Sequence, residues 1–230
     1  MPTAIITGAS RGLGRALARA LAERGWNLVL DARGGDALQE VATELAPTTK
    51  VVAVAGDVAD AAHREALVEA ARSLGGPDML VNNASALGPS PQPPLADYPI
   101  DVFRQVYEVN VTAPLALIQL ALPLLAQSPQ GRILNVTSDA GVEGYEGWGG
   151  YGSSKAALEQ LSKVLAAEQP QLRVWWVDPG DMNTQMHQEA FPGEDISDRP
   201  PPEESVPGLL RLIDDDLPSG RYSAREVAAK

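Results

Sequence analysis

The sequence contains no cysteine and only two histidines, His63 and His187, among its 230 residues. Without cysteine the chain has no disulfide, no thiol nucleophile and no cysteine-ligated metal site. Two histidines argue against a His-rich metal centre. We therefore predict a protein without a bound metal, and we expect it in the cytoplasm because nothing in the sequence requires an oxidising compartment.

Positive charge is also scarce. The chain has 18 Lys and Arg against 30 Asp and Glu, which gives a formal net charge of -12 at pH 7. Proteins bind nucleic-acid backbones and anionic membrane surfaces through clustered lysine and arginine. We therefore predict that neither a nucleic acid nor a membrane is a partner.

Long apolar runs and leader features are missing too. The longest apolar stretch, Val111–Ala126, is interrupted by Thr112, Pro114, Gln119 and Pro123. It is shorter than the roughly 20 residues of a membrane span, so we expect a buried helix there. The chain opens without a basic segment or a small-residue cleavage site, so we expect no secretory signal.

The residues that are present predict one globular domain over positions 1–230. Hydrophobic residues make up 44% of the chain and charged residues 21%, which is a globular balance. Short β-rich runs alternate with longer helical patterns, as in a parallel sheet covered by helices on both faces. The fold class is therefore predicted as doubly wound α/β, with a mostly parallel sheet of about seven strands.

The expected elements follow from hydrophobic periodicity and from glycine and proline positions. We predict strands at Thr3–Thr7, Trp26–Leu30, Val51–Ala55, Met79–Asn82, Arg132–Val136 and Leu172–Val177, and a short last strand at 220–222. We predict helices at Gly12–Glu23, Ala37–Leu45, Ile100–Gln127 and Tyr151–Glu168, the third of them bent by Pro114. Leu87–Pro99 is expected to be an extended loop and Phe191–Pro207 an irregular excursion.

A glycine-rich turn joins the first predicted strand to the first predicted helix. It reads Thr7-Gly8-Ala9-Ser10-Arg11-Gly12-Leu13-Gly14. Glycines permit a tight turn and let a pyrophosphate approach backbone N–H groups, and the helix N-terminus adds a favourable dipole. Glycine can also end a strand for steric reasons alone, but its place in a βα series favours dinucleotide binding.

Tyr151 and Lys155 are spaced i, i+4, which places them on one face of the predicted helix. A free phenol, with a pKa near 10, exchanges protons poorly at neutral pH. An ammonium about 5 Å away would favour the phenolate by roughly 3 kcal/mol at an effective dielectric constant of ~20. We therefore expect a lowered pKa for Tyr151, which could then exchange a proton with a carbonyl or alcohol oxygen.

With these motifs the sequence resembles the short-chain dehydrogenase/reductase family from about Thr3 to about Thr184. The family's Thr-Gly-x-x-x-Gly-x-Gly turn is matched in full. The resemblance implies a Rossmann fold, a nicotinamide cofactor and a homodimer or homotetramer. In the family pattern, Ser85 stands where a glycine is usual after Asn82-Asn83-Ala84.

The resemblance also assigns site residues. It implies that Tyr151 is the acid/base, that Ser138 binds the substrate oxygen and that Lys155 also holds the nicotinamide ribose. It implies that Asn110 anchors a water-linked proton relay. Taken singly, Ser138 could equally be a loop hydroxyl, and Asn110 a residue satisfying free backbone groups of a kinked helix. The expected cofactor-binding residues are Thr7, Gly8, Ser10, Arg11, Gly12, Leu13, Gly14, Arg33, Asp57, Val58, Asn82, Ala84, Tyr151, Lys155, Pro179, Gly180 and Thr184.

The choice between NADP and NAD is expected at the end of the second strand, Leu30-Asp31-Ala32-Arg33. A carboxylate there accepts hydrogen bonds from an unphosphorylated ribose, whereas an arginine pairs with a 2′-phosphate. In the family register the selecting position is Ala32, and Arg33 and Arg11 supply positive charge. We therefore predict NADP, with NAD as the alternative because of Asp31.

The sequence thus predicts an NAD(P)(H)-dependent oxidoreductase acting on a small-molecule carbonyl or alcohol. A non-catalytic redox sensor that binds the dinucleotide is the alternative, and a nucleotide-sugar epimerase or dehydratase is a third reading. Residues 183–208 are expected to form a substrate-loop insertion, in which Phe191–Pro207 is either a lid or a surface loop. The residues expected either to line the substrate pocket or to pack beneath the loops are Tyr145, Trp148, Met182, Met186 and His187.

Overall fold

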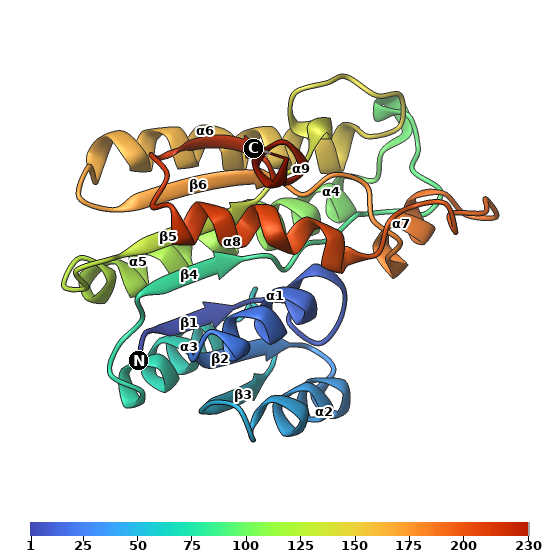
Figure 1. Ribbon diagram of the computed structural model, residues 1–230. Coiled ribbons are helices and arrows are strands. Elements are labelled where there is room, and N and C mark those ends of the chain that lie inside the picture. The colour runs from blue at the N-terminus through green and yellow to red at the C-terminus, as the bar shows by residue number, and fades with distance from the viewer. Residues whose placement is uncertain (230) are drawn as a thin grey trace.

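The computed structural model describes residues 1–229, in which seven parallel strands form one sheet (Figure 1). Their order across the sheet is β3-β2-β1-β4-β5-β6-β7. The strands are β1 (Thr3–Ile6), β2 (Asn27–Ala32), β3 (Val51–Ala55), β4 (Met79–Asn82), β5 (Arg132–Val136), β6 (Arg173–Asp178) and β7 (Gly220–Ser223). The order reverses between β1 and β4, so the prediction of a doubly wound α/β fold is confirmed.

Alternation along each strand divides the core into two layers. Ala4 and Ile6 of β1 point to one face of the sheet, whereas Ile5 points to the other. In register, Ile5 lies between Val29 of β2 and Leu80 of β4, and all three side chains belong to the same layer. Because both faces are covered, these strands consist of nearly continuous apolar runs.

Helices cover both faces of the sheet. They are α1 (Gly12–Glu23), α2 (Gly35–Leu45), α3 (Ala61–Ser73), α4 (Ile100–Tyr107), α5 (Ala113–Leu125), α6 (Gly149–Glu168), α7 (Gln185–Ala190), α8 (Val206–Asp214) and α9 (Ala224–Ala228). Short 3₁₀ turns are η1 (Leu95–Asp97), η3 (Asp139–Gly141) and η4 (Pro202–Ser205). Helices α1, α2 and α8 pack on one face, and α3 and α5 pack on the other, with the end of α6 beside them (Figure 1).

The predicted bend at Pro114 is replaced by a different irregularity. A π-helical segment, η2 (Glu108–Thr112), joins α4 to α5, and Pro114 lies in the first turn of α5. The helix runs on past Pro114, from Ile100 to Leu125, so the proline does not end it. The π segment turns Asn110 inward, where only 1% of its surface is exposed. Pro123 stays inside α5.

The stretch Ile100–Leu125 forms one 26-residue helix that is long and apolar enough to cross a membrane, and an 18-residue window within it has a mean hydropathy of 1.5. The prediction that the chain has no span considered only the shorter run Val111–Ala126. In this fold the apolar part of the helix lies on the sheet, where Leu117 and Leu125 are buried. Core helices of globular proteins pass the same test of length and composition, so the prediction stands untested.

The segment from α7 to the start of α8 is more ordered than the sequence predicts. The expected irregular excursion Phe191–Pro207 contains the 3₁₀ turn η4, and α8 already begins at Val206. Helix α7 precedes it and is capped by Thr184, whose side chain accepts a hydrogen bond from the His187 N–H at 3.2 Å. Helix α3 has no counterpart among the predicted elements.

Candidate active site

A cleft of about 1160 Å³ lies at the carboxyl edge of the sheet. The segments that follow β1, β2, β3, β4, β5 and β6 all line it, together with α7. In open parallel sheets, ligands bind at this edge where the strand order reverses. Of the predicted site residues, those that line the cleft are Gly8, Ser10, Arg11, Gly12, Leu13, Arg33, Asp57, Val58, Ala84, Ser138, Tyr151, Lys155, Pro179, Gly180 and Thr184.

The glycine turn provides a cradle for a pyrophosphate. Gly8 and Gly12 have φ angles of +66° and +56°, which favour glycine. A Cβ on Gly14 would lie 2.4 Å from the carbonyl oxygen of Gly8, so glycine is required there as well. Helix α1 begins after Arg11 without a side-chain cap from residues 1–229, and its first turn contains no acid. Its first N–H groups are therefore available to an anion, as a dinucleotide requires.

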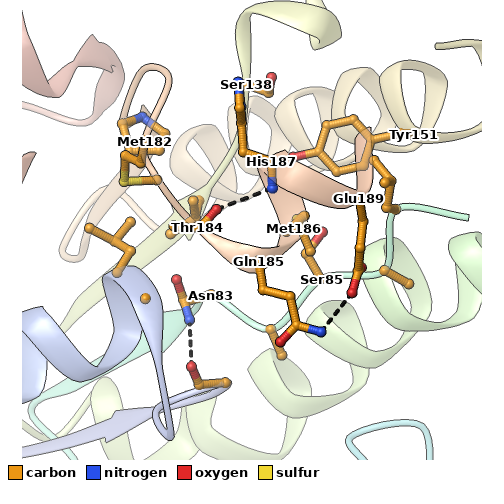
Figure 2. Close-up of a pocket in the computed structure, with 18 of the residues that line it drawn as sticks. Asn83, Ser85, Ser138, Tyr151, Met182, Thr184, Gln185, Met186, His187 and Glu189 are labelled. Atoms are coloured by element: carbon orange, nitrogen blue, oxygen red, sulfur yellow. Dashed lines mark hydrogen bonds between the residues drawn. The ribbon is translucent and has the colours of Figure 1, made fainter. Parts of the chain in front are cut away.

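Hydrogen bonds between Thr7, which follows β1, and Asn83, which follows the neighbouring strand β4, hold the glycine turn in place. The Thr7 hydroxyl accepts hydrogen bonds from the N–H groups of Asn83 (2.9 Å) and Ala84 (3.0 Å). The Asn83 amide donates to the carbonyl oxygens of Thr7 (2.8 Å) and Gly8 (3.1 Å), and Figure 2 draws one of these two hydrogen bonds. Thr7 and Gly14 thus lie behind the cleft and shape it.

The two asparagines of the predicted pair lie differently with respect to the cleft. Asn83 lines it, whereas Asn82 is buried and donates its side-chain amide to Asn135 at 2.8 Å. Asn82 is the last residue of β4, and alternation along a strand turns consecutive side chains to opposite faces. That alternation was the signal that could have distinguished the two.

Three arginines, Arg15, Arg19 and Arg33, line the end of the cleft where the adenosine half is expected. Arg33 is exposed and lines the cleft. Arg15 and Arg19 also line it, but both pair with Glu44, at 2.9 Å and 2.5 Å. These guanidinium groups lower the pKa of Glu44 to about 2. The two arginines predicted to supply charge for a 2′-phosphate, Arg33 and Arg11, are both exposed and line the cleft, and Arg11 also binds Gln185 of α7.

At the other end of the cleft, Tyr151 and Lys155 lie side by side in the first half of α6. Tyr151 is 9% exposed and Lys155 is 2% exposed. The Lys155 Nζ lies 5.4 Å from the centre of the Tyr151 ring and donates a hydrogen bond to the carbonyl oxygen of Val136 at 2.9 Å. Burial lowers the pKa of Lys155 to about 8. Spacing, proximity and access to the cleft are thus as the sequence predicts.

The direction of the Tyr151 pKa shift is opposite to the expected one. Burial raises this pKa and the negative charge of Asp178 raises it further, while the nearby hydroxyl groups of Ser138 and Ser85 oppose the rise. Desolvation of the buried phenol is the largest effect, and a Coulomb attraction to Lys155 alone does not include it. The Lys155 ammonium also binds the Val136 carbonyl. In the protein alone, the phenol is therefore kept protonated at neutral pH.

Ser138 lies two residues after the end of β5 and lines the cleft near Tyr151. It caps the 3₁₀ turn η3 by accepting a hydrogen bond from the Ala140 N–H at 3.2 Å. Its hydroxyl donates to the carboxylate of Asp139 at 2.9 Å. Because Ser138 lines the cleft, the hydroxyl can instead turn toward an oxygen bound in front of Tyr151.

Asn110 does not line the cleft but supports its floor. Its Oδ1 accepts hydrogen bonds from the Ala86 N–H (2.7 Å) and the Ser85 hydroxyl (3.1 Å). Its Nδ2 donates to the Ala86 carbonyl (2.9 Å) and the Ser154 hydroxyl (2.9 Å). Its partners are therefore the loop after β4 and helix α6, and not the helix carbonyls near Pro114. Ser85, in the position where the family usually has glycine, takes part in this network.

Helix α7 and the loop before α6 form the walls of the cleft around Tyr151. Figure 2 shows Met186 and His187 on α7, with Tyr151 and Ser138 across the cleft. The Trp148 ring contacts the rings of Tyr151 and Phe191, each with a centroid distance of 5.8 Å. Of the two readings left open, lining the pocket is the one the geometry supports. The residues concerned are Tyr145, Trp148, Met182, Met186 and His187.

Comparison with known proteins adds independent evidence. A profile of the short chain dehydrogenase family matches residues 2–195. Sepiapterin reductase of Mus musculus is 35% identical over 197 residues, which cover 80% of this chain and 76% of the mouse protein. The structure of the oxidoreductase yciK from Escherichia coli has a TM-score of 0.89 at 31% identity, covering 97% of this chain and 95% of that one. A short chain dehydrogenase structure from Shigella flexneri, in complex with NADP, has a TM-score of 0.89 at 30% identity and covers 97% of both chains.

These matches agree with the geometry of the cleft. The glycine turn and the Tyr151–Lys155 pair both fall inside the matched residues 2–195. A catalytic protein is accordingly favoured over a dinucleotide-binding redox sensor. The chain belongs to the short-chain dehydrogenase family, and it is an oxidoreductase with a nicotinamide cofactor.

Proposed function

We propose that this protein uses NADPH to reduce a small-molecule carbonyl to an alcohol, reversibly, with Tyr151 as the acid/base. The observation on which this depends is the buried pair of Tyr151 and Lys155 at one end of a cleft whose other end is a glycine turn. When bound, the nicotinamide supplies the hydride. The chain itself has to supply orientation, exclusion of water and the proton.

Tyr151 supplies the proton in the reductive direction. Its raised pKa keeps the hydroxyl protonated at neutral pH, which suits a donor to a carbonyl oxygen as negative charge develops there. The Ser138 hydroxyl orients that oxygen, exchanging its hydrogen bond to Asp139 for one to the substrate. Lys155 stands beside the phenol, and its positive charge stabilises the phenolate after the proton has left.

The predicted cofactor-binding residues that line the cleft hold the dinucleotide. The first turn of α1 takes the pyrophosphate, with Ser10 and Leu13 beside it. Asp57 and Val58 face the adenine. Pro179, Gly180 and Thr184 line the nicotinamide side, where Gly180 has a φ of +77°. The exposed Arg33 favours NADP(H) over NAD(H), and the NADP complex of the Shigella flexneri relative supports the same choice.

Residues 183–208 form the substrate loop of this proposal. The rings of Trp148, Phe191 and His187 lie next to one another along it, with centroid distances of 5.8 Å and 4.9 Å. Aromatic and methionine side chains with few polar groups suit a carbonyl compound that has a flat ring. Arg11 of the glycine turn forms a hydrogen bond with Gln185 of α7, and this contact supports the reading of the segment as a lid over the cleft.

The same proposal includes a homodimer or homotetramer in the cytoplasm. Leu115 and Leu120 of α5 and Val164 of α6 are exposed at 36%, 38% and 44%. Exposed apolar residues on two long helices suit association with a second copy. The acidic balance of the chain offers no support for a nucleic-acid or membrane partner. Size-exclusion chromatography with light scattering tests the oligomer, and a monomeric mass would contradict it.

The decisive experiment follows NADPH oxidation at 340 nm with a panel of ketones, aldehydes and ring-bearing diketones, sepiapterin among them. The Tyr151→Phe variant should lose turnover by about 10²–10⁴-fold and retain its NADPH affinity. Tyr145→Phe is the matched control, because this tyrosine lines the same cleft and binds Asp139. Wild-type rates for Tyr151→Phe would refute the assignment. NADPH binding with no turnover of any compound would favour the redox sensor.

A further inference from the structure

Outside the catalytic end of the cleft, a buried aspartate contacts a buried histidine. Asp31, the fifth residue of β2, is 2% exposed, and His63 of α3 is 8% exposed. The His63 Nε2 lies 2.6 Å from Asp31 Oδ1. Asp31 also lines the cleft, at the end where the adenosine half of a dinucleotide is expected.

The second carboxylate oxygen of Asp31 is occupied as well. Oδ2 accepts a hydrogen bond from the Gly8 N–H at 3.3 Å, and the Asp31 carbonyl accepts one from the Ala9 N–H at 2.7 Å. Asp31 thus joins the start of the glycine turn to helix α3. Both of its side-chain oxygens have partners inside the protein. Because Asp31 is only 2% exposed and its two oxygens are held toward Gly8 and His63, little of the carboxylate is accessible to ribose hydroxyls.

The chain is built locally to let His63 reach Asp31. His63 lies in the first turn of α3, which begins after Asp60, whose side chain accepts a hydrogen bond from the Ala62 N–H at 2.9 Å. The imidazole lies against Gly56, where a Cβ would be 2.3 Å from Nδ1. Gly56 therefore has to be glycine for the ring to occupy this place. Three segments, the end of β2, the loop after β3 and the start of α3, converge on the contact.

The charge around the contact bears on the choice of cofactor. A free carboxylate at the end of the second strand accepts hydrogen bonds from an unphosphorylated ribose and repels a 2′-phosphate. Arg33 lies two residues beyond Asp31, is exposed to the cleft and has no ion-pair partner among residues 1–229. If Asp31 were released toward the ribose, it would oppose the attraction of Arg33 for a phosphate.

We propose that His63 is a specificity-determining positioning residue. It holds Asp31 against Gly8 and away from the ribose, so that Arg33 can select the 2′-phosphate of NADP(H). The inference rests on the proposed function, since it concerns the cofactor of that same cleft. It also explains why an acid at position 31, the one argument for NAD in the sequence, is compatible with a preference for NADP.

The experiment measures binding rather than turnover. Dissociation constants of NADP⁺ and NAD⁺ are determined by calorimetry for the wild type and for His63→Leu, which fills the space but cannot bind Asp31. The expected result is at least a tenfold fall in the preference for NADP⁺. Weaker NADP⁺ binding, with unchanged or tighter NAD⁺ binding, should produce the fall. Equal weakening of both, with a ratio within twofold of the wild type, would show a merely structural role and overturn the proposal.

Two further variants keep the test decisive if His63→Leu folds poorly. His63→Gln retains an N–H donor near the place of Nε2, so it should keep the wild-type ratio within about threefold. Asp31→Asn removes the charge but can still bind His63. It should also change the ratio by less than about threefold, because the carboxylate does not face the ribose. A tenfold or larger gain in NADP⁺ affinity in Asp31→Asn would mean that Asp31 already repels the phosphate, and would overturn the proposal.

Dinucleotide binding by the wild type distinguishes a failure of this inference from a failure of the proposed function. If it binds neither dinucleotide, the proposed function fails. If it binds NADP⁺ more tightly than NAD⁺ and the His63→Leu ratio is unchanged, only the role of His63 fails. A wild-type preference for NAD⁺ would refute the inference and leave the reductase assignment to the Tyr151→Phe experiment.

Discussion

Replacing Asn110 by alanine should reveal how strongly the floor of the cleft depends on one side chain. The amide makes four hydrogen bonds, of 2.7 to 3.1 Å, to Ala86, Ser85 and Ser154. Asn110→Ala removes the partners of the Ala86 N–H and carbonyl groups, and each of these part-buried hydrogen bonds contributes about 1–1.5 kcal/mol. With the hydroxyls less affected, we expect a loss of about 3 kcal/mol in the free energy of unfolding.

Urea unfolding followed by tryptophan fluorescence measures that loss at one fixed protein concentration. In a chain of this length about 3 kcal/mol corresponds to a fall of roughly 6–12 °C in Tm. Turnover should fall at least tenfold, because Ser154 lies one helical turn from Tyr151 and its hydroxyl donates to the Tyr151 carbonyl at 2.6 Å. The NADPH dissociation constant should stay within about threefold, since Asn110 does not line the cleft.

Ser162→Ala is the control for this prediction. Ser162 is also buried on α6 and accepts a hydrogen bond from Asn135 at 2.8 Å, but it does not line the cleft. It should lose about 1 kcal/mol of stability and keep its turnover. A loss below about 1 kcal/mol in Asn110→Ala would refute the hydrogen-bond reasoning. Equal losses of turnover in the two variants would refute the positioning role.

Two other substitutions test the glycine turn and the buried lysine. Gly14→Ala places a Cβ 2.4 Å from the Gly8 oxygen, so it should cost about 1–3 kcal/mol and weaken NADPH binding at least tenfold in a fluorescence titration. Gly144→Ala, whose Cβ would meet open space in the described chain, should change neither. For Lys155, the folded pKa of about 8 lies below its ordinary 10.5, so the unfolded chain binds more protons between these values and wild-type stability gains with rising pH. In Lys155→Met the urea midpoint should rise less between pH 8 and 9.5, and parallel profiles would contradict this account.

The strands could be predicted closely because their signal is local. β3, β4 and β5 have the predicted bounds, since runs of valine, leucine and isoleucine between turn residues identify buried parallel strands. Helix α3 could not be found in this way. Its buried face includes His63 and Arg64, so two polar residues interrupt the apolar stripe that periodicity detects. Helix α8 was hidden by Pro207, which is tolerated in a first turn.

The site was predictable where chemistry depends on spacing along one element, and less so where it depends on packing. Tyr151 and Lys155 are one helical turn apart, so their proximity follows from the sequence. The direction of the Tyr151 pKa shift does not follow from the sequence, because it depends on burial and on the negative charge of Asp178 at the end of β6. The contact of Asp31 with His63 joins residues 32 positions apart, and it requires the pairing of β2 with β3 and the absence of a side chain at Gly56.

The reversal of strand order between β1 and β4 separates two tasks along the chain. Segments after β1, β2 and β3 surround the adenosine half of the cleft, and those after β5 and β6 surround the reacting end. Mutations that retarget the enzyme to a new compound can therefore accumulate after β5, at residues such as Trp148 and Met186, while the residues around the adenosine half of the cleft stay unchanged. The fold in this way lets evolution, or an engineer grafting a loop from a relative, vary the chemistry accepted and the electron donor used as two independent traits.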